Sequence, residues 1–259
     1  MNIGIFDSGI GGMTLLHQAM ITLPKENFIF YADTDHVPYG TKTKEQVIGF
    51  VDEVMQFMIA HNCKAVVIAC NTATSVAAEI MREKYEIPII GIEPAVKPAV
   101  EQSAGKRVMV VATPLTIQEE KLKNLVKKVD DAHLVDLLAL PRLVSFAEQG
   151  EFDTPQVEEY LREKLSSFSM EEYGELVLGC THFNYFKNSF RKLLPPHVRM
   201  IDGSTGTVNQ LKRILESRGQ LEENEGNVRY FASGREWTKG QDLKRIEMLH
   251  KRLEYMRSM

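Results

Sequence analysis

Two short apolar runs that each end in a cysteine constrain the fold of this chain more than any other feature. The first run is 66–69, followed by Cys70, and the second is 176–179, followed by Cys180. Runs of this length, bounded by small residues, are typical of strands that are buried on both faces of a parallel sheet. Each cysteine would then lie between the carboxyl end of a strand and the amino end of a helix, the edge at which open α/β sheets bind ligands.

Strand and helix patterns alternate along the whole chain, which is typical of α/β folds. Two breaks divide the alternation, a proline-containing one at 93–98 and a glycine-containing one at 203–206. We therefore expect two α/β domains. Residues 1–95 and 207–259 would form the first and residues 96–206 the second, so the chain would cross twice between them. An acidic loop is expected at 222–227. Further strands are predicted at about 3–6, 28–32, 88–92, 108–112, 134–138, 198–202 and 229–232.

The composition excludes several classes of protein. Of the 259 residues, 44% are hydrophobic and 25% charged, which are ordinary globular values. A net charge of -4 argues against a nucleic-acid partner, which would need a basic surface. No apolar run approaches the roughly 20 residues that a membrane span needs, and the amino terminus shows no signal-peptide pattern. The three cysteines form no disulfide framework. We expect a cytoplasmic protein with reduced thiols.

The glycine-rich segment 7–12 follows the first predicted strand. Glycines at a strand–helix turn let backbone N–H groups approach a phosphate, but no Lys follows them as a phosphate-binding loop requires. Asp7 would also place negative charge beside the phosphate. Asp7 is better suited to pair with an ammonium group or to hold a proton near a thiol. A simple turn, with Asp7 as a helix cap, is the structural alternative.

The cysteines themselves allow several interpretations. Cys63, at the end of an amphipathic helix, reads as a small core residue. Cys180 and His182 could bind zinc, but the paired spacing of a zinc site is missing. His182 could instead activate a thiol in a hydrolase, although a hydrolase leaves the second cysteine without a role. Two thiols that face each other across one cleft would provide acid and base chemistry from opposite sides.

Four motifs closely resemble those of bacterial glutamate racemases: 4–12 (GIFDSGIGG), 37–40 (VPYG), 69–74 (ACNTAT) and 179–182 (GCTH). They occur in order and at matching spacing through the whole chain. The resemblance implies two pseudo-symmetric, Rossmann-like α/β domains with the active site in the cleft between them. It also implies an isomerase that needs no cofactor or metal and interconverts L- and D-glutamate, supplying D-glutamate for peptidoglycan and hence for cell shape. We expect glutamate as the small-molecule partner, no membrane partner, and a homodimer.

The resemblance also carries roles to particular residues. Cys70 and Cys180 would be the two acid/base thiols, acting on D- and L-glutamate respectively. Asp7 would assist Cys70, while His182 and Glu148 would assist Cys180. The residues expected to bind the substrate are Asp7, Ser8, Pro38, Tyr39, Gly40, Asn71, Thr72, Thr113, Thr116, Thr181 and His182.

The chain departs from the family pattern at five positions. These positions are His36, Leu115, Glu119, Leu122 and Leu140. His36 stands where many members have Arg, and Leu140 where Cys is common.

An aspartate or other amino-acid racemase of the same superfamily would share both cysteines, and a two-lobed amino-acid-binding protein would share the cleft. No Arg or Lys in the sequence can be assigned to the side-chain carboxylate of the substrate.

Overall fold

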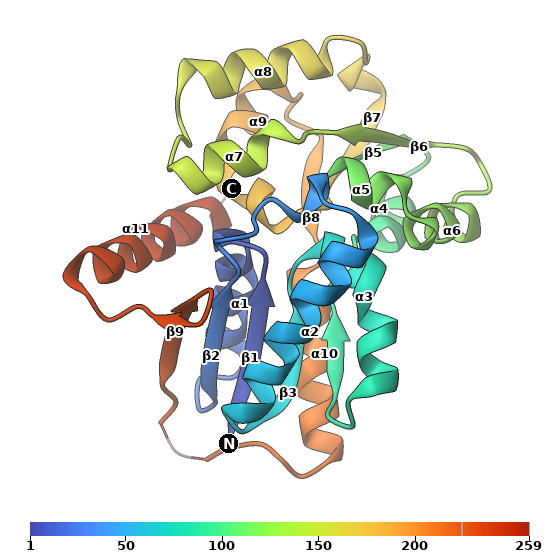
Figure 1. Cartoon of the computed structure of the whole chain (residues 1–259). Coiled ribbons are helices and arrows are strands. Elements are labelled where there is room, and N and C mark those ends of the chain that lie inside the picture. The colour runs from blue at the N-terminus through green and yellow to red at the C-terminus, as the bar shows by residue number, and fades with distance from the viewer. Residues whose placement is uncertain (224, 259) are drawn as a thin grey trace.

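The computed structural model describes residues 1–223 and 225–258, so residue 224 of the predicted acidic loop and residue 259 lie outside it. The chain forms two sheets, one in the lower and one in the upper part of Figure 1. The first sheet has the order β10 (Arg235–Glu236), β9 (Val228–Ala232), β2 (Asn27–Ala32), β1 (Asn2–Asp7), β3 (Cys63–Ile68) and β4 (Ile89–Gly91). The second has the order β6 (Val135–Ala139), β5 (Arg107–Ala112), β7 (Tyr173–Leu178) and β8 (Arg199–Asp202).

The two sheets repeat one topology, which confirms the predicted pseudo-symmetric α/β fold. All pairings are parallel except that of β10 with β9. In both sheets the first of four strands lies between the second and the third, in the orders β2-β1-β3-β4 and β6-β5-β7-β8. Cys70 follows β3 and Cys180 follows β7, so the two similar sequence runs that end in cysteine belong to equivalent strands. Every residue of β3 and of β7 is buried, as the apolar runs predict.

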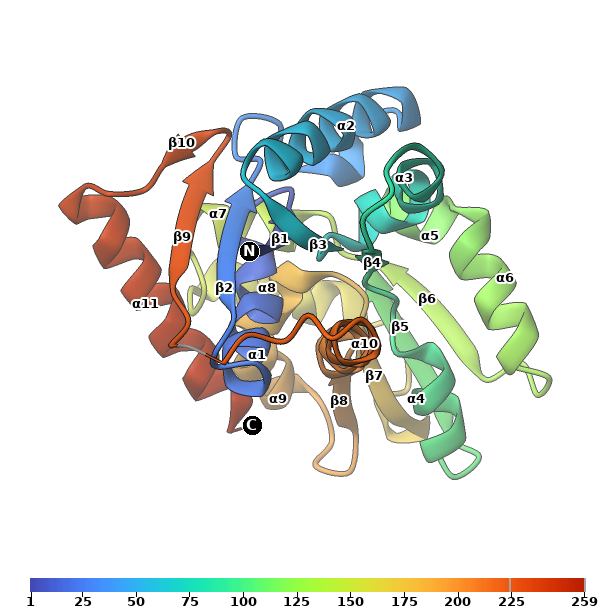
Figure 2. The ribbon, with the colours of Figure 1, turned by 90° about the horizontal axis from the view of Figure 1, so that it is seen from below.

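Helices cover the faces of both sheets, as Figure 2 shows from below. Those around the first sheet are α1 (Met13–Thr22), α2 (Lys44–Ala60), α3 (Asn71–Lys84), α10 (Ser204–Ser217) and α11 (Gly240–Arg257). Those of the second part are α4 (Val96–Gln102), α5 (Pro114–Gln118), α6 (Glu120–Val129), α7 (Arg142–Gln149), α8 (Pro155–Leu165) and α9 (Lys187–Leu193). Short 3₁₀ helices are η1 (Ile10–Gly12), η2 (Tyr39–Thr41), η3 (Met170–Glu172) and η4 (Thr181–Phe186).

The nine predicted strands are confirmed, but two predicted breaks are partly helical. Residues 93–98 include the start of α4, whose Pro98 lies in its first turn, where a missing N–H is tolerated. The break at 203–206 is the amino end of α10, which begins at Ser204. Ser204 N–H donates to Asp202 Oδ1 over 2.7 Å, so Asp202 caps this end. The division into domains at residues 95 and 207 stays a prediction.

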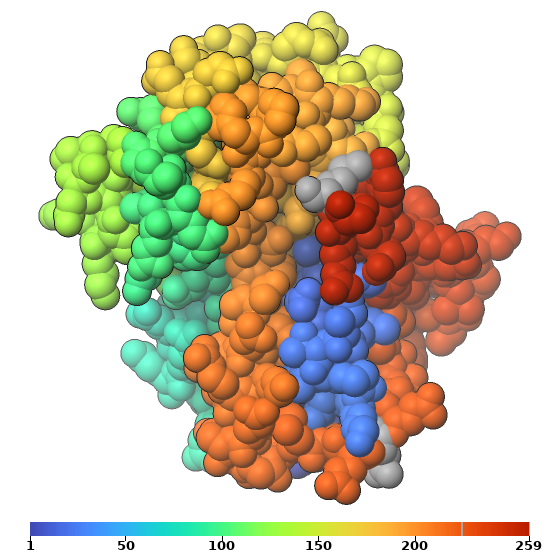
Figure 3. Space-filling view, turned by 180° about the vertical axis from the view of Figure 1, so that it is seen from behind, coloured from blue at the N-terminus to red at the C-terminus, as the bar shows by residue number. Residues whose placement is uncertain are grey.

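The hydrophobic core is continuous between the parts of the chain that form the two sheets. One apolar cluster includes Ile5 of β1, Leu16 of α1, Val111 of β5 and Phe183 of η4. Seen from behind, the amino-terminal residues (blue) lie between the segment of α10 (orange) and the carboxyl-terminal helix (red) (Figure 3). The carboxyl ends of β1 and β3 are therefore held against those of β5 and β7. Side chains at these four strand ends meet in one place.

Candidate active site

Cys70 lies at the amino end of α3. Ile68 ends β3, and Cys70 is the N-cap residue, with its Sγ accepting the Ala73 N–H over 3.4 Å. The thiol also donates to Ser8 Oγ over 3.6 Å. Burial, with a further contribution from the charge of Asp7, raises the pKa of Cys70 to about 12. The thiol is therefore protonated at neutral pH and can serve as a proton donor.

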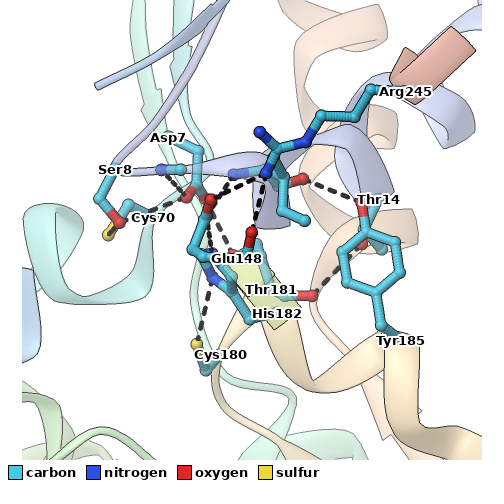
Figure 4. A network of polar contacts seen from close by, with 12 residues as sticks. Asp7, Ser8, Thr14, Cys70, Glu148, Cys180, Thr181, His182, Tyr185 and Arg245 are labelled. Carbon is cyan, nitrogen blue, oxygen red and sulfur yellow. Dashed lines mark hydrogen bonds and ion pairs between the residues drawn. The ribbon is translucent and has the colours of Figure 1, made fainter. Parts of the chain in front are cut away.

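Cys180 occupies the equivalent place in the second sheet, with different partners. It precedes η4, and its Sγ lies 3.9 Å from Nδ1 of His182. Nε2 of His182 in turn lies 2.8 Å from Glu148 Oε1, on α7. Both cysteines are 6% exposed, so both are buried in this closed arrangement. Figure 4 shows the resulting chain of contacts from Cys180 through His182 to Glu148.

The His182–Glu148 pair is charged at neutral pH. Burial by itself would lower the pKa of His182, but hydrogen bonds to Cys180 and Glu148 outweigh it and raise the pKa well above 6.5. Burial would raise the pKa of Glu148, yet the hydrogen bond and charge of His182 bring it below 4.5. A protonated imidazole therefore lies beside the Cys180 sulfur, where it stabilises negative charge.

Asp7 connects the two sides of the site. It ends β1 and is fully buried, with Oδ1 accepting the Gly9 N–H over 3.0 Å. Its other oxygen, Oδ2, accepts the hydroxyl of Thr181 over 2.9 Å. Burial raises the pKa of Asp7, against the lowering effect of the His182 charge. Asp7 thus sits behind Cys70 as a carboxyl group that can hold a proton.

The contribution of the His182–Glu148 pair to stability is expected to be largest between about pH 4.5 and 6.5. Because the pKa of Glu148 is lowered on folding, its contribution is complete above the ordinary value of 4.5 and is lost as the pH falls through the folded value. Because the pKa of His182 is raised, its contribution is complete below 6.5 and is lost as the pH rises through the folded value.

Urea unfolding of Glu148→Gln and of the wild type measures this contribution. We expect the substitution to lower the free energy of unfolding by about 3 kcal/mol at pH 5.5 and by clearly less at pH 10. Equal destabilisation at both pH values would show that the pair is not charged in the folded protein.

The glycine-rich segment packs against His182 and Glu148. A Cβ atom added to Gly9 would lie 1.9 Å from Glu148 Oε1, and one added to Gly11 would lie 2.4 Å from His182 Nδ1. The N–H of Ile10 between them donates to Glu148 Oε1 over 2.7 Å. The glycines thus let the loop after β1 approach the imidazole and the carboxylate. They serve this contact, and the backbone N–H groups of Gly9 and Ile10 are occupied by carboxylates of the protein itself.

Both thiols line one small cavity, which also brings together most of the residues expected to bind the substrate. Its volume is about 10 Å³, about the space that one water molecule needs. Asp7, Glu148 and Thr116 do not line it. Thr116 lies behind the cavity and bonds with the hydroxyls of Thr72 (3.2 Å) and Thr113 (2.9 Å). The lining residues are Ser8, Pro38, Tyr39, Gly40, Cys70, Asn71, Thr72, Thr113, Val144, Cys180, Thr181 and His182.

A larger cavity of about 770 Å³ lies elsewhere, where the chain crosses between the sheets. Its lining includes Arg82, Glu93, Lys97 and Asp202 but no cysteine or histidine. Volume therefore does not identify the site, because both thiols and His182 line the small cavity and none of them lines the larger one. Among the described residues, no group of three or more His, Cys, Asp or Glu side chains is placed to hold a metal ion.

Several residues of the site carry no sequence signal. Tyr185 donates its hydroxyl to the Ile10 carbonyl over 2.9 Å, and Thr14 donates to the Thr181 carbonyl over 3.3 Å. Val144 lines the cavity, and Arg245 reaches Glu148 from α11. Each looks like an ordinary helix residue in the sequence. Only their positions in the fold bring them to the site.

The departures from the family pattern are all accommodated. His36 bonds Asp33 over 2.9 Å and stacks on Phe50, and Asp33 also accepts the Tyr39 hydroxyl over 2.6 Å. Glu119 pairs with Lys44 of α2 over 3.0 Å. The remaining three are apolar, with Leu122 and Leu140 buried and Leu115 packed against a core cluster.

The comparison with known proteins agrees with this geometry. A profile of the Asp/Glu/Hydantoin racemase family matches residues 13–211. The glutamate racemase of Lachnospira eligens is 53% identical over 265 aligned positions that cover all of both chains. Glutamate racemase 2 of Bacillus subtilis is 54% identical over 236 positions, 90% of this chain and 89% of that one. This chain belongs to the glutamate racemase family.

A solved glutamate racemase, from Francisella tularensis in complex with D-glutamate, has the same fold. Its TM-score to this structure is 0.81 at 30% sequence identity, covering 96% of this chain and 93% of the other. The family membership predicted from the four motifs is therefore confirmed. No helix within residues 1–223 and 225–258 combines the length and the apolar character that crossing a membrane requires.

Proposed function

We propose that this member of the glutamate racemase family interconverts L- and D-glutamate, with Cys70 and Cys180 as the two acid/base groups. The observation that carries the proposal is that the two thiols line one cavity from equivalent strand ends of the two sheets. Racemisation removes the Cα proton on one face of the substrate and returns a proton on the other. Two groups on opposite faces achieve this without rotation of the substrate.

The surroundings of Cys70 and Cys180 favour different protonation states of the two sulfurs. With L-glutamate, the Cys180 thiolate takes the Cα proton and becomes a thiol, and the Cys70 thiol gives its proton to the opposite face and becomes a thiolate. The reverse transfers convert D-glutamate. Protonated His182 beside Cys180 and the raised pKa of Cys70 favour the state that accepts L-glutamate. Asp7, bonded through Ser8 to the Cys70 side, supports the opposite state.

The carbanion formed at Cα needs stabilisation by the protein's own groups. Hydroxyls of Ser8, Thr72, Thr113 and Thr181 line the cavity beside the amino end of α3. Hydroxyls and N–H groups placed there favour the charge that moves into the α-carboxylate. Asn71 Oδ1 is buried and has no hydrogen-bond partner among the described residues, so it is free to accept a hydrogen bond from the substrate ammonium group.

Substrate entry requires the two halves to separate, because glutamate is larger than the cavity. The polar contacts across the cleft include Asp7–Thr181 at 2.9 Å and Thr72–Thr113 at 2.9 Å, and they lie beside the apolar cluster that both halves share. These neutral or single-charge bonds are worth only about 0.5–3 kcal/mol each. Closure over glutamate would exclude water from the reaction.

The test is racemisation of glutamate by the purified protein, followed by circular dichroism in parallel with aspartate. We expect conversion of both glutamate enantiomers, and α-deuterium in the product in deuterated water. Binding without α-hydrogen exchange would instead indicate a two-lobed binding protein, and faster conversion of aspartate would indicate the other racemase class.

The catalyst is expected to need no cofactor, since two thiols and hydrogen-bond donors supply the proton transfers. Activity should survive dialysis against a chelator and treatment with a carbonyl-trapping reagent. Loss that is restored by a metal or by pyridoxal phosphate would contradict this expectation.

The family resemblance supports three finer proposals. They are a homodimer, a cytoplasmic location without nucleic-acid partners, and supply of D-glutamate for peptidoglycan. Light scattering of the purified protein tests the first. Fractionation of cells tests the second, and rescue of a strain that requires D-glutamate tests the third.

A further inference from the structure

Arg245 connects the carboxyl-terminal helix to the helpers of Cys180. It lies on α11, and its Nη2 donates to the backbone carbonyl of Glu148 over 3.0 Å and approaches Glu148 Oε2 at 3.5 Å. Figure 4 shows its guanidinium above Glu148, on the far side of that carboxylate from Cys180. Arg245 touches neither thiol and does not line the active-site cavity. Its hydrogen bonds to the site are made to Glu148.

We propose that Arg245 is a positioning residue for the Cys180 side of the reaction, fixing Glu148 so that its carboxylate holds His182 against the sulfur. The proposal rests on the two-thiol function above. It assigns to the carboxyl-terminal helix a part in proton transfer, besides its part in packing.

The contacts of Arg245 fix Glu148 in two ways. Glu148 is the next-to-last residue of α7, so its carbonyl is one of those that lack a partner within the helix. Arg245 supplies the missing donor and places a cation at the negative end of the helix. The same guanidinium approaches Oε2, while Oε1 is occupied by the Ile10 N–H and by His182. Backbone and carboxylate are therefore held together, and the carboxylate cannot turn away from the imidazole.

Arg245 is a second cation beside Glu148, in addition to His182, and the charges around Glu148 give it a role. The polar groups that face it are Asp7 from β1, His182 and Tyr185 from η4, and Arg245 from α11. Burial would raise the pKa of Glu148, and His182, the Ile10 N–H and, to a smaller extent, Arg245 lower it. The charge of His182 also acts on Asp7. Without Arg245, the His182 imidazolium would be the one cation among the described residues that compensates both carboxyl groups.

The helix has other anchors, so its packing does not depend on Arg245. Arg252 donates to the Tyr185 carbonyl over 2.9 Å and pairs with Asp153 over 2.7 Å. Leu249 and Leu253 are buried on the same helix. Arg245 itself is 39% exposed, which suits a side chain that contributes little to the core. Arg252→Gln is therefore a matched control: it loosens the same helix without touching Glu148.

The test uses iodoacetamide alkylation of the full-length protein without glutamate, with each cysteine followed separately by mass spectrometry. The thiolate is the reacting form, so the rate reports the charge around each sulfur. We expect Arg245→Gln to slow alkylation of Cys180 by about twofold to fivefold, the size expected for a partly exposed ion pair. Cys70, on the other side of the cavity, is the internal reference and should react at the wild-type rate. Arg245→Lys, which keeps the charge, should recover most of the Cys180 rate.

Racemisation of glutamate supplies the second readout. Arg245→Gln should lower kcat/KM by a similar factor and move the acid limb of its pH profile to higher pH, while Arg252→Gln should leave that limb in place. Equal changes at Cys70 and Cys180, or the same pattern in Arg252→Gln, would overturn the proposal in favour of a packing role. A wild type that does not racemise glutamate would refute the proposed function, and the alkylation pattern would still decide the role of Arg245.

Discussion

Racemisation of glutamate is expected to fall about 10³-fold in kcat/KM when either Cys70 or Cys180 is replaced by alanine, since each removes one acid/base group. Because the enantiomers have equal free energies, kcat/KM must fall by the same factor in both directions. The measurement is the initial rate from L-glutamate and from D-glutamate. The two single losses should also be strongly non-additive, since one missing thiol already blocks the transfer.

Cys63 is the control for this pair of substitutions. It is the buried first residue of β3, the strand that leads to Cys70, but its Sγ packs 3.8 Å from the Met58 sulfur and does not line the cavity. Cys63→Ala should keep racemisation within about twofold of wild type, because surrounding apolar groups tolerate the small change in volume. A wild-type rate in Cys70→Ala or in Cys180→Ala would exclude that thiol from the reaction.

The second large effect is expected from Gly11→Ala. The added methyl group would lie 2.4 Å from His182 Nδ1 and 2.5 Å from Thr181 Oγ1, so the imidazole or the loop must move. A displacement of about 1 Å in such a site can cost about 10²-fold in rate. We therefore expect kcat/KM to fall about 10²-fold in a protein that still folds, as judged by its thermal unfolding.

Gly206 supplies the matched glycine control. It lies inside α10, and no neighbouring atom is within 4 Å of a Cβ added there. Gly206→Ala should stabilise the helix by about 0.5–1 kcal/mol and leave kcat/KM unchanged. Wild-type activity in Gly11→Ala would show that the loop after β1 does not need its close approach to His182.

The sequence was sufficient to predict the repeated part of this architecture. Strands that are buried along their whole length leave apolar runs, and β3 and β7 carry the same signal because they occupy equivalent positions. The residues that follow such runs lie at the functional edge of a sheet, which is why Cys70 and Cys180 could be placed together. Glu148 came only from the family resemblance, because nothing in its helix distinguishes it from other surface carboxylates.

The parts that could not be predicted depend on contacts between distant segments. Arg245 lies 97 positions from its partner, Glu148, on a helix with several other basic residues. The role of Gly9 and Gly11 could not be predicted either. A glycine in the sequence can indicate a close approach, but it does not show which side chain makes the approach. The start of α10 was missed because serine, threonine and glycine at 203–206 also favour turns, and the cap by Asp202 decides the outcome.

Exchange of the α-hydrogen in deuterated water, resolved by enantiomer, tests the two-thiol mechanism most directly. Cys180→Ala keeps the thiol assigned to D-glutamate, so it should incorporate deuterium into D-glutamate and return it as D-glutamate. Cys70→Ala should do the same with L-glutamate only. Exchange of both enantiomers by either variant, or exchange of the opposite enantiomer by each, would contradict the assignment of one thiol to each face of the substrate.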